Sequence, residues 1–258
     1  MRERNCMNYG IEGKVALVTG AAGRGLGRAD ALALAKEGVK VGVMDIQNCD
    51  ETVSLIQKEG VKALGLTCDI SNEDQVKEVA SKIVKELGIV EILVNNASIL
   101  TTVGMFADID PKRFNRDVEV NLIGTANVTR AVWPGMLEKK WGRVISMASI
   151  AGTRGGAGQA SYSATKASMI GFGKTLALEG GRFGITSNII APGVMKSEAA
   201  TTLIRPDMLE RMEKKTAVRR LGEVTEISSL VAFLCSQQAA YITGQLIEVD
   251  GGMGLFTF

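Results

Sequence analysis

Residues 14–27 read KVALVTGAAGRGLG, a short run of apolar and β-branched residues followed by a glycine-rich turn. A helical pattern rich in Ala and Leu then extends from Gly25 to Glu37. Glycines at such a junction allow the backbone to turn sharply and to approach an anion, while the free amides at the start of the helix face it. A glycine-rich string is weak evidence alone, but its place between a first strand and a first helix favours a nucleotide-binding turn over a merely tight connection.

The same alternation of short strands and longer helices continues along the chain. We expect strands at residues 14–19, 39–45, 61–67, 89–95, 142–149, 185–191 and 245–249. We expect helices at residues 25–37, 50–59, 72–87, 111–138 and 160–182. Strands separated by helices of this length require right-handed crossovers and a parallel sheet covered on both faces. The pattern therefore predicts an α/β fold, a single-domain doubly wound parallel sheet of Rossmann type.

One domain over residues 13–258 accounts for this pattern, with an N-terminal extension over residues 1–12. The segment at about 194–216 is polar and charged, contains Pro206 and interrupts the alternation. Such an interruption late in an α/β chain is typical of a lid, so we expect this segment to cover the functional site.

Composition excludes several classes of function. The chain of 258 residues carries 30 Lys and Arg against 28 Asp and Glu, a formal net charge of +2. This balance indicates neither a nucleic-acid partner nor an anionic membrane surface, and it favours a small-molecule substrate. Histidine is absent from the sequence. Proton chemistry must therefore use Tyr, Lys or a carboxylate in place of imidazole.

Cysteine spacing and hydropathy point to a cytoplasmic protein without a metal site. The four cysteines, Cys6, Cys49, Cys68 and Cys235, lie far apart with no CxxC pair, so we expect reduced thiols and no bound metal. No apolar run approaches the length that crosses a bilayer, and the polar start MRERNCMNYG lacks the apolar region of a secretion signal.

Acidic residues after the second and third strands suggest how a dinucleotide would be read. Asp45 ends the second strand, in VGVMDIQ, where a carboxylate can accept hydrogen bonds from the adenosine ribose hydroxyls. A 2′-phosphate would meet this carboxylate as a like charge, which favours NAD over NADP. Arg24 is the opposing signal, because its guanidinium could reach a 2′-phosphate. Asp69, in TCDIS, could bond the adenine edge or cap the next helix, and Ser71 competes for the cap.

Further motifs follow the glycine turn in a fixed order. They are Asn95-Asn96-Ala97, Asn121, Ser149, Tyr162-x-x-x-Lys166, Pro192-Gly193 and the closing YITGQLIEVDGG. Together with the glycine turn, they resemble the short-chain dehydrogenase/reductase family from about Gly13 to Met253. A YxxxK pair alone occurs by chance, but a serine 13 residues before the tyrosine and the other motifs in order make the resemblance specific.

The resemblance implies hydride transfer between a nicotinamide cofactor and a secondary alcohol or ketone, with Asn121, Ser149, Tyr162 and Lys166 as catalytic residues. Tyr162 would be the acid and base, and Lys166, four residues on along a helix, would favour the phenolate by Coulomb attraction. The resemblance also implies that Lys166 bonds the nicotinamide ribose, that Ser149 donates to the substrate oxygen, and that Asn121 holds a water in a proton relay.

The residues expected to contact the cofactor are Gly20, Gly23, Arg24, Gly25, Leu26, Gly27, Asp45, Asp69, Ile70, Asn96, Ala97, Tyr162, Lys166, Pro192, Gly193 and Ser197. Ser197 occupies the place of a family threonine that contacts the nicotinamide amide, and it is equally suited to capping a lid helix. Two positions depart from the family pattern. Four residues in place of three separate Gly20 from Gly25, and Ser98 stands where the family has glycine.

Substrate choice is expected to depend on residues 98–103, residues 150–158 and the lid. A hydroxyacyl or oxoacyl thioester such as a CoA ester ranks slightly ahead of a hydroxysteroid and a cyclic or sugar alcohol. Asp45 argues against a biosynthetic acyl-carrier reductase, because such reductions usually use NADPH. The alternative is a non-catalytic subunit that supports an active paralogous partner, an idea motivated by the altered glycine turn and Ser98.

An oligomer is expected by resemblance, either a dimer or a tetramer. It would be built from the helices at 111–138 and 160–182 and from the last strand, and a paralogous subunit could take part. The terminal segment GLFTF, residues 254–258 with Phe256 and Phe258, could cover the pocket of a neighbouring subunit.

Overall fold

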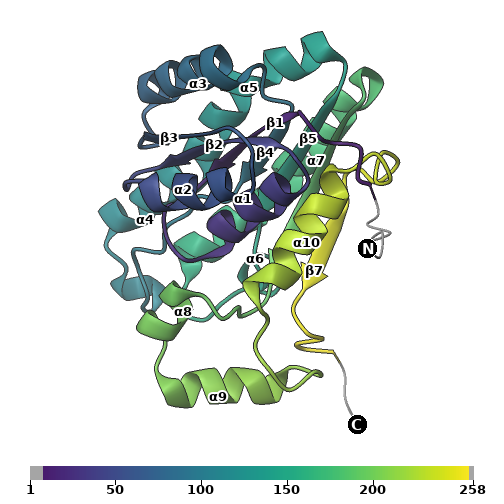
Figure 1. Cartoon of the computed structure of the whole chain (residues 1–258). Helices are drawn as coiled ribbons and strands as arrows, with labels where there is room; N and C mark the ends of the chain where they lie inside the picture. Colours follow the sequence, from purple (N-terminus) through teal and green to yellow (C-terminus); the bar gives the residue numbers. More distant parts are fainter. Residues whose placement is uncertain (1–7, 256–258) are drawn as a thin grey trace, which may run out of the picture.

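The computed structural model of the chain describes residues 8–255. Residues 1–7 of the expected N-terminal extension, and Phe256 and Phe258 of the terminal segment, lie outside the described residues. Within residues 8–255, the chain forms one α/β domain around a seven-stranded sheet whose paired strands all run parallel (Figure 1). The predicted fold class is therefore confirmed.

The strand order of the sheet is β3-β2-β1-β4-β5-β6-β7. The strands are β1 (Val15–Thr19), β2 (Lys40–Asp45), β3 (Ala63–Thr67), β4 (Ile92–Asn95), β5 (Gly142–Met147), β6 (Ile185–Pro192) and β7 (Leu246–Val249). The order in which the chain adds strands to the sheet reverses between β1 and β4. From β1, the strands β2 and β3 extend the sheet to one side, and β4 to β7 extend it to the other. In an open α/β sheet a crevice forms at the carboxyl ends of the strands at this point, and ligands bind there.

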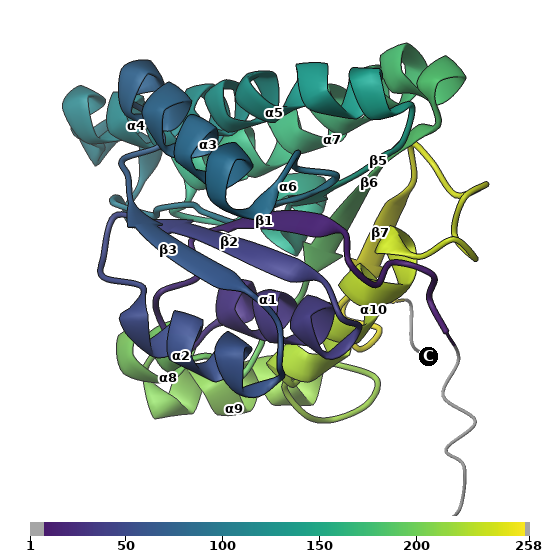
Figure 2. The same ribbon diagram turned by 45° about the horizontal axis from the view of Figure 1, so that its top comes forward.

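Helices cover both faces of the sheet (Figure 2). One face carries α1 (Leu26–Lys36), α2 (Asp50–Lys58) and α10 (Val224–Cys235). The other face carries α3 (Glu73–Leu87), α4 (Pro111–Val118), α5 (Thr125–Lys139) and α7 (Ala160–Gly180). Alternate residues of β1 serve the two layers: Ala16 and Val18 belong to the core under α1 and α10, and Val15 and Leu17 to the core under α3 and α5.

Helix α10 is an element that the sequence analysis did not predict. Its buried residues include Ile227, Val231 and Leu234, which join the core cluster that also contains Leu34 of α1. A capping box marks its start, because the Glu223 side chain and the side chain three residues into the helix bond each other's backbone amides. Because the first member of this pair is Glu in place of Ser, Thr, Asp or Asn, the sequence alone did not mark the start of the helix.

The prediction of one continuous helix over residues 111–138 is wrong. Between α4 and α5 the chain forms a π-helical turn over Glu119–Gly124. A Cβ on Gly124 would lie 2.6 Å from Cγ1 of Ile70, so the bare backbone allows this turn to approach the loop after β3. Wide turns of this kind are frequent at functional sites, and this one contains Asn121.

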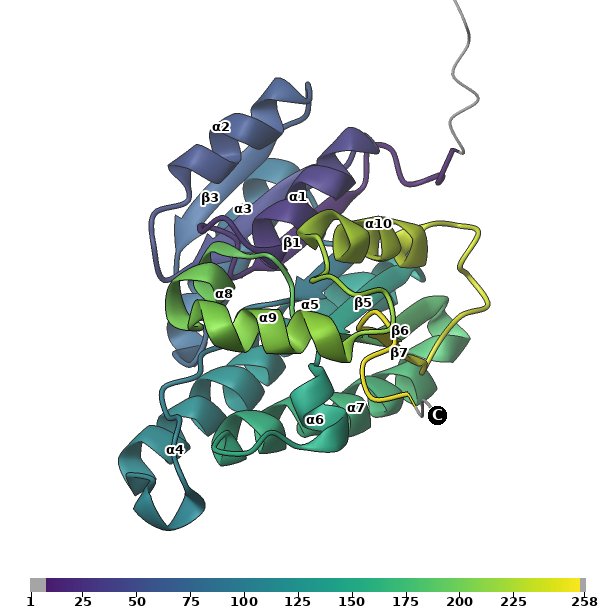
Figure 3. The same ribbon diagram turned by 90° about the horizontal axis from the view of Figure 1, so that it is seen from below.

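The segment at 194–216 lies beyond one end of the sheet, apart from both helical layers (Figure 3). It contains α8 (Glu198–Leu203) and α9 (Pro206–Lys215). At its base, Met195 pairs with Gly222 in an isolated bridge, and the Gly222 amide donates to Val194 O at 3.1 Å. Its role as a lid stays a prediction, as does assembly into a dimer or tetramer. Across residues 8–255, no helix has both the length and the apolar character needed to span a bilayer.

Asp30 in α1 is a buried carboxylic acid without a hydrogen-bond partner. Its side chain is fully buried, and neither carboxyl oxygen is bonded. Burial holds the pKa of Asp30 well above its usual value. Above the ordinary pKa of a free Asp, about 4, the unfolded chain loses this proton more readily than the folded chain, so folding opposes ionisation.

We therefore expect Asp30→Asn to flatten the dependence of stability on pH. The free energy of unfolding of the parent should fall between pH 4.5 and 8 through the ionisation of Asp30 in the unfolded chain, whereas the variant should lack this contribution. Urea denaturation of both proteins across this range measures the difference. Asp74→Asn, at a side chain 97% exposed, is the matched control. Equal slopes for parent and Asp30→Asn would contradict the prediction.

Candidate active site

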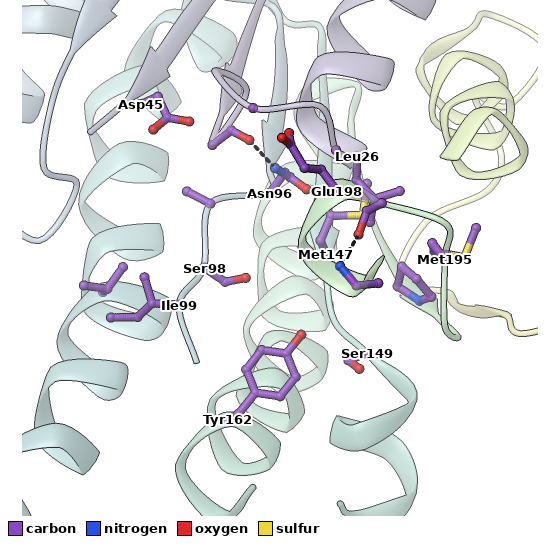
Figure 4. Close-up of a pocket in the computed structure, with 18 of the residues that line it drawn as sticks. Leu26, Asp45, Asn96, Ser98, Ile99, Met147, Ser149, Tyr162, Met195 and Glu198 are labelled. Carbon is purple, nitrogen blue, oxygen red and sulfur yellow. Dashed lines mark hydrogen bonds between the residues drawn. The ribbon is translucent and has the colours of Figure 1, made fainter. Parts of the chain in front are cut away.

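A cavity of about 910 Å³ opens at the carboxyl ends of the central strands, where the strand order reverses (Figure 4). Asp45 lies at one end of it, and Tyr162 and Ser149 lie side by side at the other. Of the residues predicted to contact the cofactor or to act in catalysis, all line the cavity except Gly27 and Asn121. Segments far apart in the sequence are therefore gathered as predicted.

The glycines of the turn after β1 have different tasks. A Cβ on Gly23 or Gly25 would meet no protein atom within 4 Å, so both positions leave bare backbone facing the cavity. Helix α1 begins at Leu26, and its N-cap residue Gly25 supplies no capping side chain; its first turn contains no acidic residue. Gly27 serves packing instead, because a Cβ there would lie 2.5 Å from Nδ2 of Asn96. Bare backbone and uncapped helix amides fit the pyrophosphate of a dinucleotide.

The glycine turn accommodates its extra residue because Ala21 and Ala22 are buried and their backbone groups are hydrogen-bonded to neighbouring side chains. Thr52 Oγ1 donates to Ala21 O at 2.7 Å, Arg28 donates to Ala22 O, and Ala22 N donates to Asp45 Oδ2 at 2.9 Å. The sequence analysis did not identify Thr52 or Arg28, since a Thr and an Arg in helices carry no distinctive spacing.

Asp45 and Asp69 are both fixed by hydrogen bonds at the cavity wall. The second oxygen of Asp45, Oδ1, accepts from Gln47 N at 2.9 Å. Asp69 accepts from Ser71 N and Oγ at 3.0 and 2.7 Å through Oδ1, and from Arg116 at 2.6 Å through Oδ2. Burial pushes the pKa of Asp69 upward, but the hydrogen bonds from Ser71 and Arg116 together lower it below its usual value.

The alternative role of Asp69 or Ser71 as a helix cap is wrong. Asn72 caps α3, where its Oδ1 accepts from the backbone amides of Asp74 and Gln75 at 3.1 Å. The carboxylate of Asp69 instead remains on the cavity wall, held by Arg116. Its contact with an adenine edge stays a prediction.

Asn96 joins the loop after β4 to the glycine turn. Its Nδ2 donates to Thr19 O at 3.0 Å and to Gly20 O at 2.9 Å (Figure 4). Thr19 Oγ1 accepts in return from the amides of Asn96 and Ala97, both at 3.1 Å. Gly20, at φ +68°, has no room for a Cβ, which would lie 2.6 Å from Ala97 Cα. Asn96 therefore shapes the cavity by holding two loops together.

Tyr162 and Ser149 present hydroxyl groups to the same end of the cavity. Tyr162 stands in the first turn of α7, whereas Ser149 caps the short helix α6 (Ile150–Arg154) by accepting from Ala151 N at 3.1 Å. Lys166, one turn after Tyr162, is 5% exposed. Its Nζ donates to Met147 O at 2.8 Å and lies 5.6 Å from the centre of the Tyr162 ring.

Burial decides the titration of this pair. It raises the pKa of Tyr162 above its usual value, a rise that a hydrogen bond with Ser149 opposes. Burial also lowers the pKa of Lys166 to about 8. Burial is thus the largest influence on the pKa of Tyr162, and the expectation that the ammonium of Lys166 lowers this pKa stays a prediction. Tyr162 is a protonated phenol at neutral pH, suited to donating a proton.

Asn121 stands behind the cavity wall. Its Oδ1 accepts from Ile99 N at 2.7 Å, and its Nδ2 donates to Ile99 O at 2.8 Å and to Thr165 Oγ1 at 3.1 Å. The side chain therefore fixes Ile99, a cavity residue, against α7. Its role in holding a water stays a prediction.

A second buried connection, which the sequence analysis missed, reaches the residue before Tyr162. Asp117 is fully buried and accepts from Ser161 Oγ at 2.6 Å and from Thr101 Oγ1 at 2.7 Å. This carboxylate ties the substrate-side segment at 98–103 to the start of α7. Asp117 stands four residues before Asn121, and Ser161 stands directly before Tyr162. Neither spacing is distinctive enough to predict the hydrogen bond between Asp117 and Ser161 from the sequence.

The remaining predicted residues lie where β6 meets the segment at 194–216. Pro192 ends β6, and a Cβ on Gly193 would lie 2.8 Å from Asp250 Cα, so this position needs glycine to bring the chain along the cavity. Ser197 both lines the cavity and caps α8, where its Oγ accepts from Ala200 N at 3.2 Å. The interpretation of Ser197 as a helix cap is confirmed, and its contact with the nicotinamide amide stays a prediction.

Comparison with known proteins gives consistent matches along nearly the whole chain. A family described as enoyl-(acyl carrier protein) reductase matches residues 20–254. The chain is 40% identical over 243 residues to a 3-oxoacyl-(acyl-carrier-protein) reductase of Staphylococcus epidermidis, with 93% of this chain and 98% of that protein covered. It is 39% identical over 239 residues to an acetoacetyl-CoA reductase of Shinella zoogloeoides, with 93% and 98% covered.

Solved structures agree with these sequence matches. An NAD⁺-bound xylitol dehydrogenase superposes with a TM-score of 0.87 at 29% identity, over 94% of this chain and 99% of that one. A protein of Sinorhizobium meliloti 1021 described as a short-chain alcohol dehydrogenase gives a TM-score of 0.90 at 33% identity, over 96% and 98%. Since sequence, fold and the gathering of the motifs around one cavity agree, the chain belongs to the short-chain dehydrogenase/reductase family of nicotinamide-dependent oxidoreductases.

Proposed function

We propose that this protein transfers a hydride between NAD and a secondary alcohol or ketone, with a hydroxyacyl or oxoacyl thioester as the first substrate candidate. The observation that carries the proposal is that the Tyr162 and Ser149 hydroxyls lie together at one end of the cavity, with the buried Lys166 Nζ 5.6 Å from the centre of the Tyr162 ring. Two hydroxyl donors directed at one point can bind a carbonyl oxygen and supply its proton.

Each of these residues has a separate task. When bound, the nicotinamide supplies the hydride for reduction and accepts it in oxidation. Ser149 Oγ accepts from Ala151 N, and its proton, which here serves the hydrogen bond with Tyr162, would be donated to the substrate oxygen. Tyr162 holds the phenol proton that passes to this oxygen during reduction. Lys166, largely protonated at neutral pH, then stabilises the phenolate that forms.

Asp45 supports NAD as the cofactor. Both of its oxygens accept from backbone amides, at Ala22 and Gln47, so the carboxylate is fixed at the cavity wall. A 2′-phosphate at this place would meet a negative charge that cannot move away, whereas ribose hydroxyls can donate to it.

Two substrate classes find support. The names of the relatives describe reductases of a 3-oxoacyl carrier thioester and of acetoacetyl-CoA, which favours the thioester. The structural similarity to an NAD⁺-bound xylitol dehydrogenase favours a sugar alcohol as the second candidate. The non-catalytic alternative loses one of its motives, because the extra residue of the glycine turn is held firmly by Asp45, Thr52 and Arg28.

Turnover of two probe substrates tests the choice. We expect the purified chain to reduce acetoacetyl-CoA with NADH and to show kcat/KM for this reaction well above that for xylitol oxidation with NAD. Absorbance of NADH at a fixed cofactor concentration measures both. Turnover of xylitol alone would support the second candidate, and turnover of neither, despite binding of NADH, would support a non-catalytic subunit.

Tyr162→Phe removes the proton donor and leaves the ring in place. We expect kcat to fall by about 10²- to 10⁴-fold, the usual contribution of a positioned acid or base. Calorimetric titration should show NADH binding unchanged. Tyr241→Phe, at a fully exposed tyrosine outside the cavity, serves as the matched control and should leave kcat unchanged. A Tyr162→Phe variant with near-normal kcat would remove this residue as the acid and base.

The two directions of the reaction should depend oppositely on pH. Reduction needs the protonated phenol and oxidation the deprotonated one. Since burial raises the pKa of Tyr162, the protonated form is complete at neutral pH and declines only as pH rises. We expect kcat/KM for oxidation to increase above neutrality as the phenolate forms, with a shallower rise above the pKa of Lys166, about 8, where the ammonium that stabilises the phenolate is lost. We expect kcat/KM for reduction to fall at high pH, where Tyr162 loses its proton. An oxidation rate that declines from pH 7 to 9 would contradict this.

A further inference from the structure

A charged cluster lies beside the glycine turn, at the end of the cavity that contains Asp45. We define the adenosine-side cluster as Arg24, Arg28, Asp45 and Glu51. Glu51, in the first turn of α2, lies 2.9 Å from Arg28 NH2 through Oε2 and 3.6 Å from Arg24 NH2 through Oε1. No part of the sequence analysis assigned a function to Glu51.

The two arginines of the cluster differ in the solvent exposure of their side chains and in how firmly they are held. The side chain of Arg28 is 9% exposed and is bonded to Ala22 O, so it belongs to the framework of the turn. The side chain of Arg24 is 74% exposed, and Arg24 lines the cavity. Of these two guanidinium groups, Arg24 is therefore the one that can turn toward a bound ligand.

Asp45 and Glu51 are connected through the turn. Asp45 accepts from Ala22 N, Ala22 O accepts from Arg28, and Arg28 donates to Glu51. With Glu51 ionised, the two carboxylates balance the two guanidinium groups. Without Glu51, the cluster has a net charge of +1, located on the exposed Arg24.

The hydrogen bond from Arg28, followed by the positive charges of both arginines, lowers the pKa of Glu51 below its usual value. Its position in the first turn of α2 favours a negative charge as well. Glu51 is thus ionised at neutral pH, when a cofactor would bind.

We infer that Glu51 is a cofactor-specificity residue, which holds and neutralises Arg24 so that this guanidinium is not available to a 2′-phosphate. This inference rests on the proposed preference for NAD. Asp45 repels the 2′-phosphate directly, whereas Glu51 removes the cation that would attract it. Selectivity of this kind combines a repulsive group with the loss of an attractive one.

Glu51→Gln tests the inference by binding alone. Calorimetric titration at low ionic strength would compare NADPH with NADH, and adenosine 2′,5′-bisphosphate with AMP. We expect the ratio of NADPH to NADH affinity to rise about tenfold, which is the order of one screened charge pair at this distance. The gain should shrink at high salt, because the groups involved are exposed. The double variant Glu51→Gln, Arg24→Gln should lose the gain.

Control variants separate specificity from damage to the turn. Asp50→Asn removes a neighbouring exposed carboxylate from the same helix turn and should change the ratio by less than about twofold. Arg24→Gln with Glu51 intact should also leave the ratio nearly unchanged, since Arg24 is already neutralised. This variant tests the inference even if Glu51→Gln fails to fold. A large fall of the ratio in Arg24→Gln would show an available Arg24 and overturn the inference.

Other outcomes are equally decisive. An unchanged ratio in Glu51→Gln, equal weakening of both cofactors, or a gain that persists in the double variant would each overturn the role of Glu51. If the parent chain binds NADPH more tightly than NADH, the proposed use of NAD itself fails. If the parent prefers NADH and Glu51→Gln has no effect on the ratio, only the inference about Glu51 fails.

Discussion

The hydrogen bonds that join Asn96 to the end of β1 hold the two halves of the sheet in register where the crevice opens. At this point β2 and β3 continue the sheet on one side of β1 and β4 to β7 on the other, and these bonds and the β1–β4 ladder connect the glycine turn to the half of the sheet that begins with β4. Gly20 and Gly27 leave the room for this contact. The end of the cavity with Asp45 and the end with Tyr162 thereby keep a fixed separation, which the proposed hydride transfer between two bound molecules would require.

Desolvation governs the catalytic end more than direct charge contacts do. Lys166 is buried, and its hydrogen bond to Met147 O fixes the amine at the end of β5. The same burial keeps the proton on Tyr162. Ser149 is held by its role as a helix cap, and the start of α7 before Tyr162 is held by the buried bond from Ser161 to Asp117. A hydrogen bond joins Ser149 and Tyr162.

The hydrophobic periodicity of the sequence was sufficient to predict the fold, and the order of the motifs was sufficient to predict most of the residues that line the cavity. Both predictions depend on short stretches of sequence and not on tertiary contacts. Strand and helix lengths determine a doubly wound sheet, and carboxyl ends of parallel strands necessarily meet at one edge. The break at 119–124 was not predictable, since a π-helical turn has the composition of an ordinary helix. Helix α10 was missed because its capping pair begins with Glu223, which is not a typical cap residue. Pairings such as Asp117 with Ser161, or Glu51 with Arg24, depend on tertiary distance and involve residues that look like ordinary surface polar groups.

Helix α9 has no buried side chain, although it belongs to the segment that borders the cavity. Because α9 lies outside the hydrophobic core, its residues contribute little to the free energy of folding. Substitutions in α9 should therefore change the free energy of unfolding little, whereas substitutions at buried positions of β5 or α7 disturb the core. A chain built in this way can accept changes in α9 while the cavity lining, which contains no residue of α9, stays constant. Diversification of α9 and conservation of the fold are then compatible within one sequence lineage.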